Sequence, residues 1–209
     1  MKVKIFLFML LFPVLLQAQQ WNMLSLKAGV YTPYDLKTGA IYGIDYGTVL
    51  NKNISLMISG DLYYKSIVND NYLESSDRLG VNIRTGQRLN EWTGWHLPLT
   101  GKIRYEIPLE NSLVCPYAVG ALGYGVTHVS FMSYDNTGRD GEENSFTYNG
   151  IVWQLGLGVL YRVSRNTDLL FEVIQNSAEF TEHEDFNRFT TLNSSGVLFR
   201  LGVSLEFLR

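Results

Sequence analysis

Hydrophobic and polar residues alternate along most of the chain, and the segment 95–107 shows this pattern most clearly. Apolar residues occupy its odd positions, beginning with Trp95, whereas His96, Lys102 and Arg104 occupy even positions. A β-strand directs successive side chains to opposite faces, so one face of this segment is apolar and the other is polar. A helix would scatter the same charges around its circumference. The pattern therefore predicts a long strand.

Seven further segments share this alternation, although three glycines between positions 120 and 125 weaken it in one of them. The eight segments are 24–30, 40–47, 54–65, 95–107, 114–131, 153–162, 169–174 and 197–207. An even number of antiparallel strands of about ten residues is typical of a membrane-spanning β-barrel. The sequence thus predicts an all-β fold, a transmembrane antiparallel up-and-down β-barrel of about eight strands.

The connections between these segments alternate between short and long. Short turns are expected at 51–53, 108–112 and 164–168, and long polar connections at 66–93, 133–145 and 176–195, with one short connection at 33–37 among the latter group. Outer-membrane barrels place short turns in the periplasm and long loops outside the cell. Residues 78–84 alternate weakly, which predicts that the first long connection extends a hairpin above the membrane.

The first residues have the features of an export signal. Two lysines precede an apolar stretch at 5–16, and Ala18 supplies a small residue for signal peptidase. The stretch is shorter than the roughly 20 residues of a membrane-spanning helix, and no longer apolar run follows. We therefore expect residues 1–18 to be a cleaved signal peptide and residues 19–209 to form one outer-membrane β-barrel domain.

Composition excludes several classes of partner and chemistry. The formal net charge is −3 and the lysines and arginines are not clustered, so nucleic acid is not an expected ligand. Cys115 is the only cysteine, so an internal disulfide is excluded. The glycines between 120 and 125 are not a nucleotide fingerprint, because no helix is expected to follow them. We expect no cofactor and no metal, and we assign no catalytic residue.

A soluble barrel of the lipocalin or avidin type would also alternate, with its apolar face inside and its polar face in water. Here large aromatic residues bracket the apolar faces near the strand ends, as in the aromatic girdles of membrane barrels. They include Trp95, Tyr105, Trp153, Tyr161 and Phe207.

The polar faces carry charges of both signs, which are suited to pairing in a narrow lumen. These charges are Lys27, Asp45, Asp61, Lys102, Arg104, Glu106, Arg162, Glu172, Arg200 and Glu206. The pattern favours a membrane barrel whose lumen is plugged by ion pairs, and it disfavours a general porin.

Two segments in the middle of the chain form a recognisable hairpin. The first runs Trp-His-Leu-Pro-Leu-Thr-Gly-Lys-Ile-Arg-Tyr-Glu at 95–106, and the second runs Pro-Tyr-Ala-Val-Gly-Ala-Leu-Gly-Tyr at 116–124. Together they resemble the central strands of the OmpA/OmpX-like outer-membrane β-barrel superfamily. The segment 197–207 is similar to the closing strand of that superfamily, which ends in an aromatic residue. The resemblance implies a barrel architecture in the outer membrane. It does not specify an activity, because the superfamily includes adhesins, structural proteins, small transporters and enzymes.

The enzymes of this architecture include lipid A 3-O-deacylases, which carry a His-x-Ser pair in the seventh strand. The matching positions here are Gln175 and Ser177. Glutamine cannot accept the proton of the serine, so the mechanism is lost at that position. A second His-x-Ser pair occurs at His128 and Ser130, with Glu142 further on, but it lies in the fifth strand, where the resemblance gives no support. Two polar residues at the outer rim of a strand explain that pair better.

The sequence favours a non-enzymatic outer-membrane protein with a structural or surface-interaction role. The alternatives are a lipid A-modifying hydrolase and a passage for small apolar molecules. The acidic stretch at 179–185 lacks the spacing of a calcium loop and is expected to be a solvated extracellular loop. Expected partners are the lipid and lipopolysaccharide of the outer membrane and an extracellular protein or surface ligand that the long loops bind. We expect a monomer.

Overall fold

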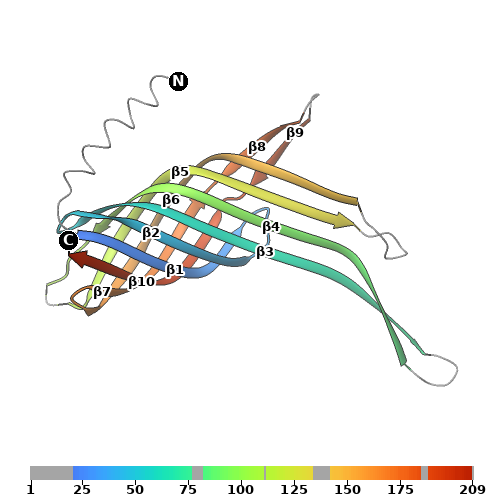
Figure 1. The fold of residues 1–209 in the computed structure, drawn as a ribbon, viewed down its shortest axis with the longest axis horizontal. Helices are drawn as coiled ribbons and strands as arrows, with labels where there is room; N and C mark the ends of the chain where they lie inside the picture. The colour runs from blue at the N-terminus through green and yellow to red at the C-terminus, as the bar shows by residue number, and fades with distance from the viewer. Residues whose placement is uncertain (1–20, 77–81, 111, 134–141, 185–187, 209) are drawn as a thin grey trace.

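The computed structural model describes residues 21–76, 82–110, 112–133, 142–184 and 188–208, and of these it describes the side chains outside 21, 68–90, 133–144, 181–191 and 208. Eight strands close into one antiparallel barrel, in the order β1-β10-β7-β6-β5-β4-β3-β2 (Figure 1). The remaining pair, β8 and β9, forms a separate two-stranded sheet. The expectation of an all-β, eight-stranded barrel is confirmed. Among the described residues, no helix is long and apolar enough to cross a membrane.

Each barrel strand pairs with the strands that precede and follow it in the barrel order, so the chain runs up and down around the wall. The barrel strands are β1 (Trp21–Pro33), β2 (Gly39–Asn51), β3 (Ile54–Ser76), β4 (Asn82–Glu106), β5 (Val114–Ser133), β6 (Glu142–Ser164), β7 (Thr167–Ser177) and β10 (Gly196–Leu208). The first and last strands close the wall along their whole length, from Trp21 opposite Leu208 to Pro33 opposite Gly196. The closure leaves the membrane-embedded part of the wall without a free strand edge.

The alternation in the sequence corresponds to the two faces of the barrel wall. Leu99, Leu157 and Leu201 point outward and keep more than 60% of their surface exposed. Lys102 and Arg200 point inward and are fully buried. A water-soluble barrel has the opposite arrangement, with its apolar residues inside. This exterior is therefore suited to an apolar medium such as the hydrocarbon of a bilayer.

The predicted short turns lie together at one end of the barrel, and the predicted long connections lie at the other (Figure 1). In two of these long connections, more residues belong to strands than the sequence predicted. β3 and β4 remain paired from Lys65 opposite Gly94 to Ser76 opposite Asn82, which extends the expected hairpin far beyond the other strands. β5 and β6 pair as far as Ser133 opposite Glu142, although residues 133 and 142–145 were expected to be loop.

The third long connection contains the separate hairpin. β8 (Glu179–Glu184) pairs with β9 (Arg188–Asn193) within the segment that was expected to be a polar loop. The hairpin rises from the end of β7 and returns to the start of β10, so it lies at the same end of the barrel as the two long hairpins (Figure 1).

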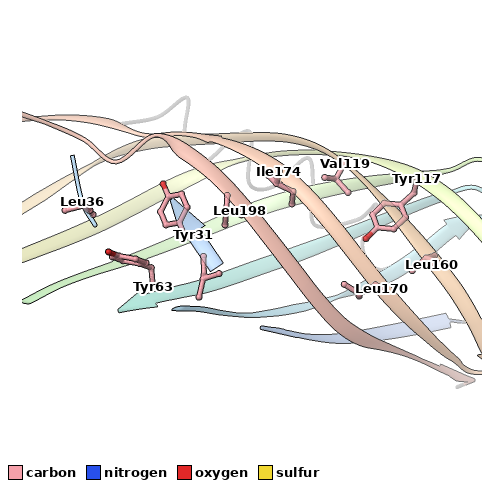
Figure 2. Close-up of a cluster of buried hydrophobic side chains, with 10 residues drawn as sticks. Tyr31, Leu36, Tyr63, Tyr117, Val119, Leu160, Leu170, Ile174 and Leu198 are labelled. Atoms are coloured by element: carbon pink, nitrogen blue, oxygen red, sulfur yellow. The ribbon is translucent and has the colours of Figure 1, made fainter. Parts of the chain in front are cut away.

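Apolar side chains in the lumen gather toward its two ends (Figure 2). Tyr31, Leu36 and Tyr63 lie together toward one end, and Tyr117 and Leu160 lie toward the other. All five are at least 96% buried. The interior between these two groups is the place where the charged inward residues meet.

Candidate functional site

Four inward charges from four different strands form the centre of the lumen. The ammonium Nζ of Lys27 lies 2.6 Å from Oδ2 of Asp45 and 3.5 Å from Oε2 of Glu172. Nζ of Lys102 lies 3.1 Å from Oδ2 of Asp45 and 2.9 Å from Oε1 of Glu172. Each carboxylate thus bridges two ammonium groups. The hydroxyl of Ser59 also donates to Asp45, at 2.6 Å.

A guanidinium group extends this cluster to two more strands. Nη2 of Arg200 lies 2.8 Å from Oε2 of Glu172, and Nη1 lies 2.5 Å from Oδ1 of Asp61. We call the six side chains Lys27, Asp45, Asp61, Lys102, Glu172 and Arg200 the ionic layer. It contains three cations and three anions, and each of these residues is at least 96% buried. Buried charges are tolerated when they are paired and hydrogen-bonded in this way.

The ionic layer fits into the lumen because neighbouring inward positions are glycines. A Cβ atom added to Gly43 would collide with Oδ1 of Asp61 and would lie within about 3.5 Å of both Lys27 and Arg200. At Gly202 an added Cβ would crowd the side chain of Lys27. Glycine therefore serves here as the residue that leaves room for large charged neighbours.

An aromatic group covers the ionic layer on the side of the long hairpins. The rings of Tyr31 and Tyr63 meet edge to face with centroids 5.5 Å apart, and the His96 ring lies 6.2 Å from that of Tyr31. Phe180, from the start of β8, reaches His96 with a centroid distance of 5.9 Å. Phe180 is 1% exposed and packs with Tyr148, Val152 and Ala178. We call Tyr31, Tyr63, His96 and Phe180 the aromatic cap.

Hydrogen bonds tie the β8–β9 hairpin to the barrel next to this cap. The amide Nδ2 of Asn176 donates to the hydroxyl of Tyr31 at 2.8 Å, and that hydroxyl donates to the carbonyl of Ser194. The backbone N–H of Ala178 donates to the hydroxyl of Ser195 at 3.0 Å. The hairpin is therefore joined to the mouth of the barrel at its two ends.

The connection between β1 and β2 closes over the same mouth. The backbone N–H of Asn193 donates to the Asp35 carboxylate at 2.6 Å, and the N–H of Asp35 donates to the carbonyl of Asn193 at 3.1 Å. The Tyr63 hydroxyl donates to the carbonyl of Lys37. Leu36 is 4% exposed, so it lies inside the mouth rather than in solvent.

A second, smaller polar group lies toward the short turns. Nη2 of Arg104 lies 2.9 Å from Oε1 of Glu106, and its guanidinium carbon lies 5.5 Å from the ring centroid of Tyr117. Arg162 reaches Asp168 at 3.7 Å but is more than half exposed. A hollow of about 160 Å³ at this end is lined in part by Glu106, Arg162 and Asp168. The lumen is thus polar at this end, apolar beside it and ionic at its centre.

The serines and histidines singled out in the sequence lie away from the ionic layer. Gln175 is on the exposed face of β7, and its amide donates to the carbonyl of Asn176 at 3.2 Å. His128 stacks on Trp95 with centroids 5.6 Å apart and lies 2.9 Å from the Thr147 hydroxyl. The side chain of Glu142 lies outside the described residues. Gln175, two residues before Ser177, cannot serve as its base.

The acidic stretch and the cysteine show no cation-binding arrangement within the described residues. No group of three histidine, cysteine, aspartate or glutamate side chains there is placed to hold a metal ion. The side chains at 181–185 lie outside the described residues. Cys115 is partly buried beside the apolar group that contains Tyr117, as expected for a small packing residue.

Sequence reasoning identified all six members of the ionic layer as inward charges but missed the apolar parts of the lumen. Leu170 and Ile174 blur the two faces of β7 in the sequence, yet both are buried inside, on either side of Glu172. Phe180 was missed because it lies in a segment rich in acidic residues. Ala178 and Phe180 are two residues apart, so a strand would direct both to the same face, and this spacing was the available signal for a packed hairpin.

Comparisons with known proteins agree with this architecture. A model of the outer membrane protein beta-barrel domain matches residues 5–207. Ail, the attachment invasion locus protein of Yersinia pestis, in complex with the heparin analogue sucrose octasulfate, shares 14% identity at a TM-score of 0.51, over 90% of this chain and 98% of that one. Neisserial surface protein A shares 16% identity at a TM-score of 0.50, over 90% and 97% of the two chains. A major outer membrane protein from Thermus thermophilus shares 12% identity at a TM-score of 0.51, over 89% and 99% of the two chains. No curated protein matches the chain.

Proposed function

The chain belongs to the outer membrane β-barrel family, and from that premise we propose that it is a closed barrel that displays an interaction surface outside the cell. It is an integral protein of the outer membrane that crosses the bilayer with eight strands. The proposal has two parts: the lumen conducts no solutes, and the long hairpins make the contacts that constitute the function.

The ionic layer is the observation that supports a closed lumen. Its six side chains come from six of the eight barrel strands, so they bridge the lumen in several directions. The aromatic cap lies on one side of the layer, and the group around Tyr117 lies on the other. An eight-stranded barrel has an interior just wide enough for side chains to fill.

The β3–β4 hairpin is the observation that carries the interaction role. β2 stops pairing with β3 at Ala40 opposite Tyr64, so the outer edge of β3 from Lys65 to Ser76 has no strand partner in the part of the chain that the structure describes. Such an edge offers a row of backbone donors and acceptors to an extended segment of another protein. A structural protein without surface contacts has no need of this extension.

The charge of the extracellular segments narrows the chemistry of the partner. The segments 66–93, 134–145 and 176–195 together carry twelve acidic and five basic residues. Ail was solved with a heparin analogue, which is a polyanion. The acidic segments of this chain disfavour a polyanion, because like charges repel at short range. We propose instead a protein surface that is neutral or basic.

Export and cleavage are part of the same proposal. We propose that residues 1–18 direct the chain to the Sec pathway and are removed, which leaves Gln19 as the first residue of the mature protein. Mass spectrometry of the mature protein from outer membranes tests this, because a retained segment 1–18 would contradict it.

A shortened hairpin separates an interaction role from a structural one. Residues 68–91 are replaced by Asn-Gly, which forms a tight two-residue turn between Ile67 and Trp92. The wild-type and shortened barrels are labelled with a fluorophore, refolded in detergent and tested for binding to intact cells of neighbouring bacteria and of a host epithelium. We expect binding by the wild type and at least a tenfold loss for the shortened barrel. Equal binding by the two barrels, or none by either, would exclude the interaction role.

A further inference from the structure

A groove runs along the lipid-facing side of β5 in the half of the barrel nearer the short turns. Its floor consists of Ala118 and Gly120, whose outward positions carry little or no side chain. On β4, Tyr105 stands opposite Ala118 and Ile103 stands opposite Gly120. On β6, the corresponding neighbours are the large side chains Leu157 and Leu155. The resulting hollow has a volume of about 490 Å³.

The small residues of the groove are not required by the packing of the wall. A Cβ added to Gly120 would meet only the Leu155 side chain, at 3.6 Å, and one added to Gly101 would meet only a backbone oxygen, at 3.8 Å. Both are ordinary contact distances. By contrast, a Cβ at the inward Gly123 would collide with the backbone of β4. Glycine weakens a strand, so the open floor costs stability that a larger residue would restore.

The position of the groove along the barrel identifies the leaflet that it faces. It extends along β4 from Gly101 to Tyr105, about 13 Å at the rise of a strand. Tyr105 lies at the aromatic belt next to the short turns, and Gly101 lies near the middle of the outward apolar band. Short turns face the periplasm, so the groove lies in the periplasmic leaflet. Because barrel strands are tilted by about 40°, the groove spans about 10 Å of the roughly 15 Å of hydrocarbon in that leaflet.

We propose that this groove binds one acyl chain of a phospholipid from the periplasmic leaflet. The lipid headgroup lies at the level of Tyr105 and Tyr161, whose rings are half exposed at this belt. The hydrocarbon chain follows the floor toward Gly101 and contacts Ile103 and Leu155, which line the hollow. The binding is apolar and local, and it does not depend on the proposed role of the hairpins.

The shape of the groove favours a lipid chain over a second copy of the barrel. Its floor is one strand wide, so the backbones of its two walls lie only about 10 Å apart. The outer wall of a second barrel is convex and carries large side chains, so it would rest on Leu155 and Leu157 without reaching Gly120. A thin, flexible hydrocarbon chain can lie along the floor and fill the hollow.

Native mass spectrometry tests the proposal on the refolded barrel in mild detergent, with dioleoyl phosphatidylethanolamine added in steps. The test variants are Ala118→Leu and Gly120→Leu, which fill the floor of the groove. The matched control is Ala28→Leu, an outward-facing alanine on β1 at the opposite side of the barrel. We expect one retained lipid for the wild type and for the control. We expect binding at least about tenfold weaker for each groove variant, because buried methylenes are lost.

Every other result would overturn the proposal. Equal retention by the wild type and both groove variants would place the lipid elsewhere, and loss in the control as well would indicate general delipidation. A wild-type dimer that Ala118→Leu dissociates would make the groove a contact between copies. Preferential retention of added lipid A would assign the groove to the outer leaflet. A heat-modifiability gel on each variant establishes that the barrel has folded before binding is compared.

Discussion

Nη1 of Arg200 lies 2.5 Å from Oδ1 of Asp61, although 139 residues separate the two along the chain. Arg200 is on β10 and Asp61 is on β3, and two strands of the barrel wall lie between them. The contact therefore joins the closing strand to a strand that it does not touch through the backbone. It forms only after the barrel has closed, so its energy contributes to the stability of the closed barrel.

Glu172 is the member of the ionic layer whose loss should cost most. Its carboxylate contacts Lys27, Lys102 and Arg200, so Glu172→Gln leaves three buried cations with two anions. Breaking a buried ion pair from one side costs about 3–5 kcal/mol. We expect a loss of that size in the free energy of unfolding, measured by urea titration of the barrel in lipid vesicles.

The control for this measurement is Glu110→Gln, in the exposed turn between β4 and β5. It should change the free energy of unfolding by less than about 0.5 kcal/mol, as is usual for exposed sites. Equal effects of the two substitutions would show that the ionic layer adds no specific stability.

The Arg200–Asp61 contact should appear as an energetic coupling. Arg200→Met and Asp61→Leu are made singly and together, and the three free energies of unfolding are compared with that of the wild type. Arg200→Met removes the cation that Asp61 contacts, and Asp61→Leu leaves Arg200 with Glu172, which two lysines already share. Each single variant therefore unbalances the buried charges, whereas the double variant removes one charge of each sign. We expect the double variant to lose less stability than the sum of the single losses, with a coupling of about 1–3 kcal/mol. If the two single losses of stability simply add in the double variant, the contact between Arg200 and Asp61 is contradicted.

The strand pattern was predictable because the period of alternation in a sequence is a local property. The inward charges were identified for the same reason. Their pairing was not predictable, since it depends on register and closure: Lys102 reaches both Asp45 and Glu172 across the lumen. The β8–β9 hairpin was missed because polar residues surround Phe180, the anchoring ring within the described side chains, in the sequence. The lipid-facing groove depends on cross-strand neighbours, which only the register supplies.

Phe180→Ala should release the β8–β9 hairpin while the barrel stays folded. The ring is buried against Tyr148 and Val152, and removal of a buried phenylalanine costs about 3–5 kcal/mol. We expect faster hydrogen exchange of the backbone amides at 179–184 and 188–193, with no change in β1 or β2. Phe171→Ala, on the lipid-facing side of β7, is the control and should leave exchange in the hairpin unaltered. Unchanged exchange in Phe180→Ala would show that the ring does not anchor the hairpin.

Cysteine labelling on intact cells should show which end of the barrel faces outward. Single cysteines are introduced at Lys52, in a short turn, and at Ser75, in the β3–β4 hairpin, in a Cys115→Ser background. A membrane-impermeant maleimide should label position 75 in intact cells and position 52 only after the outer membrane is permeabilised. Labelling of position 52 alone in intact cells would show that the barrel has the opposite orientation in the membrane.

A closed lumen is the central claim, and single-channel recording in planar lipid bilayers tests it most directly. The purified wild-type barrel is inserted from detergent, with a sixteen-stranded porin as the positive control for insertion and an unheated gel as the control for folding. Since the ionic layer and the aromatic cap occupy the lumen, we expect the porin to give stable conductance steps and this protein to give none. Reproducible unitary steps from the folded wild-type barrel would show an open pore and contradict the account.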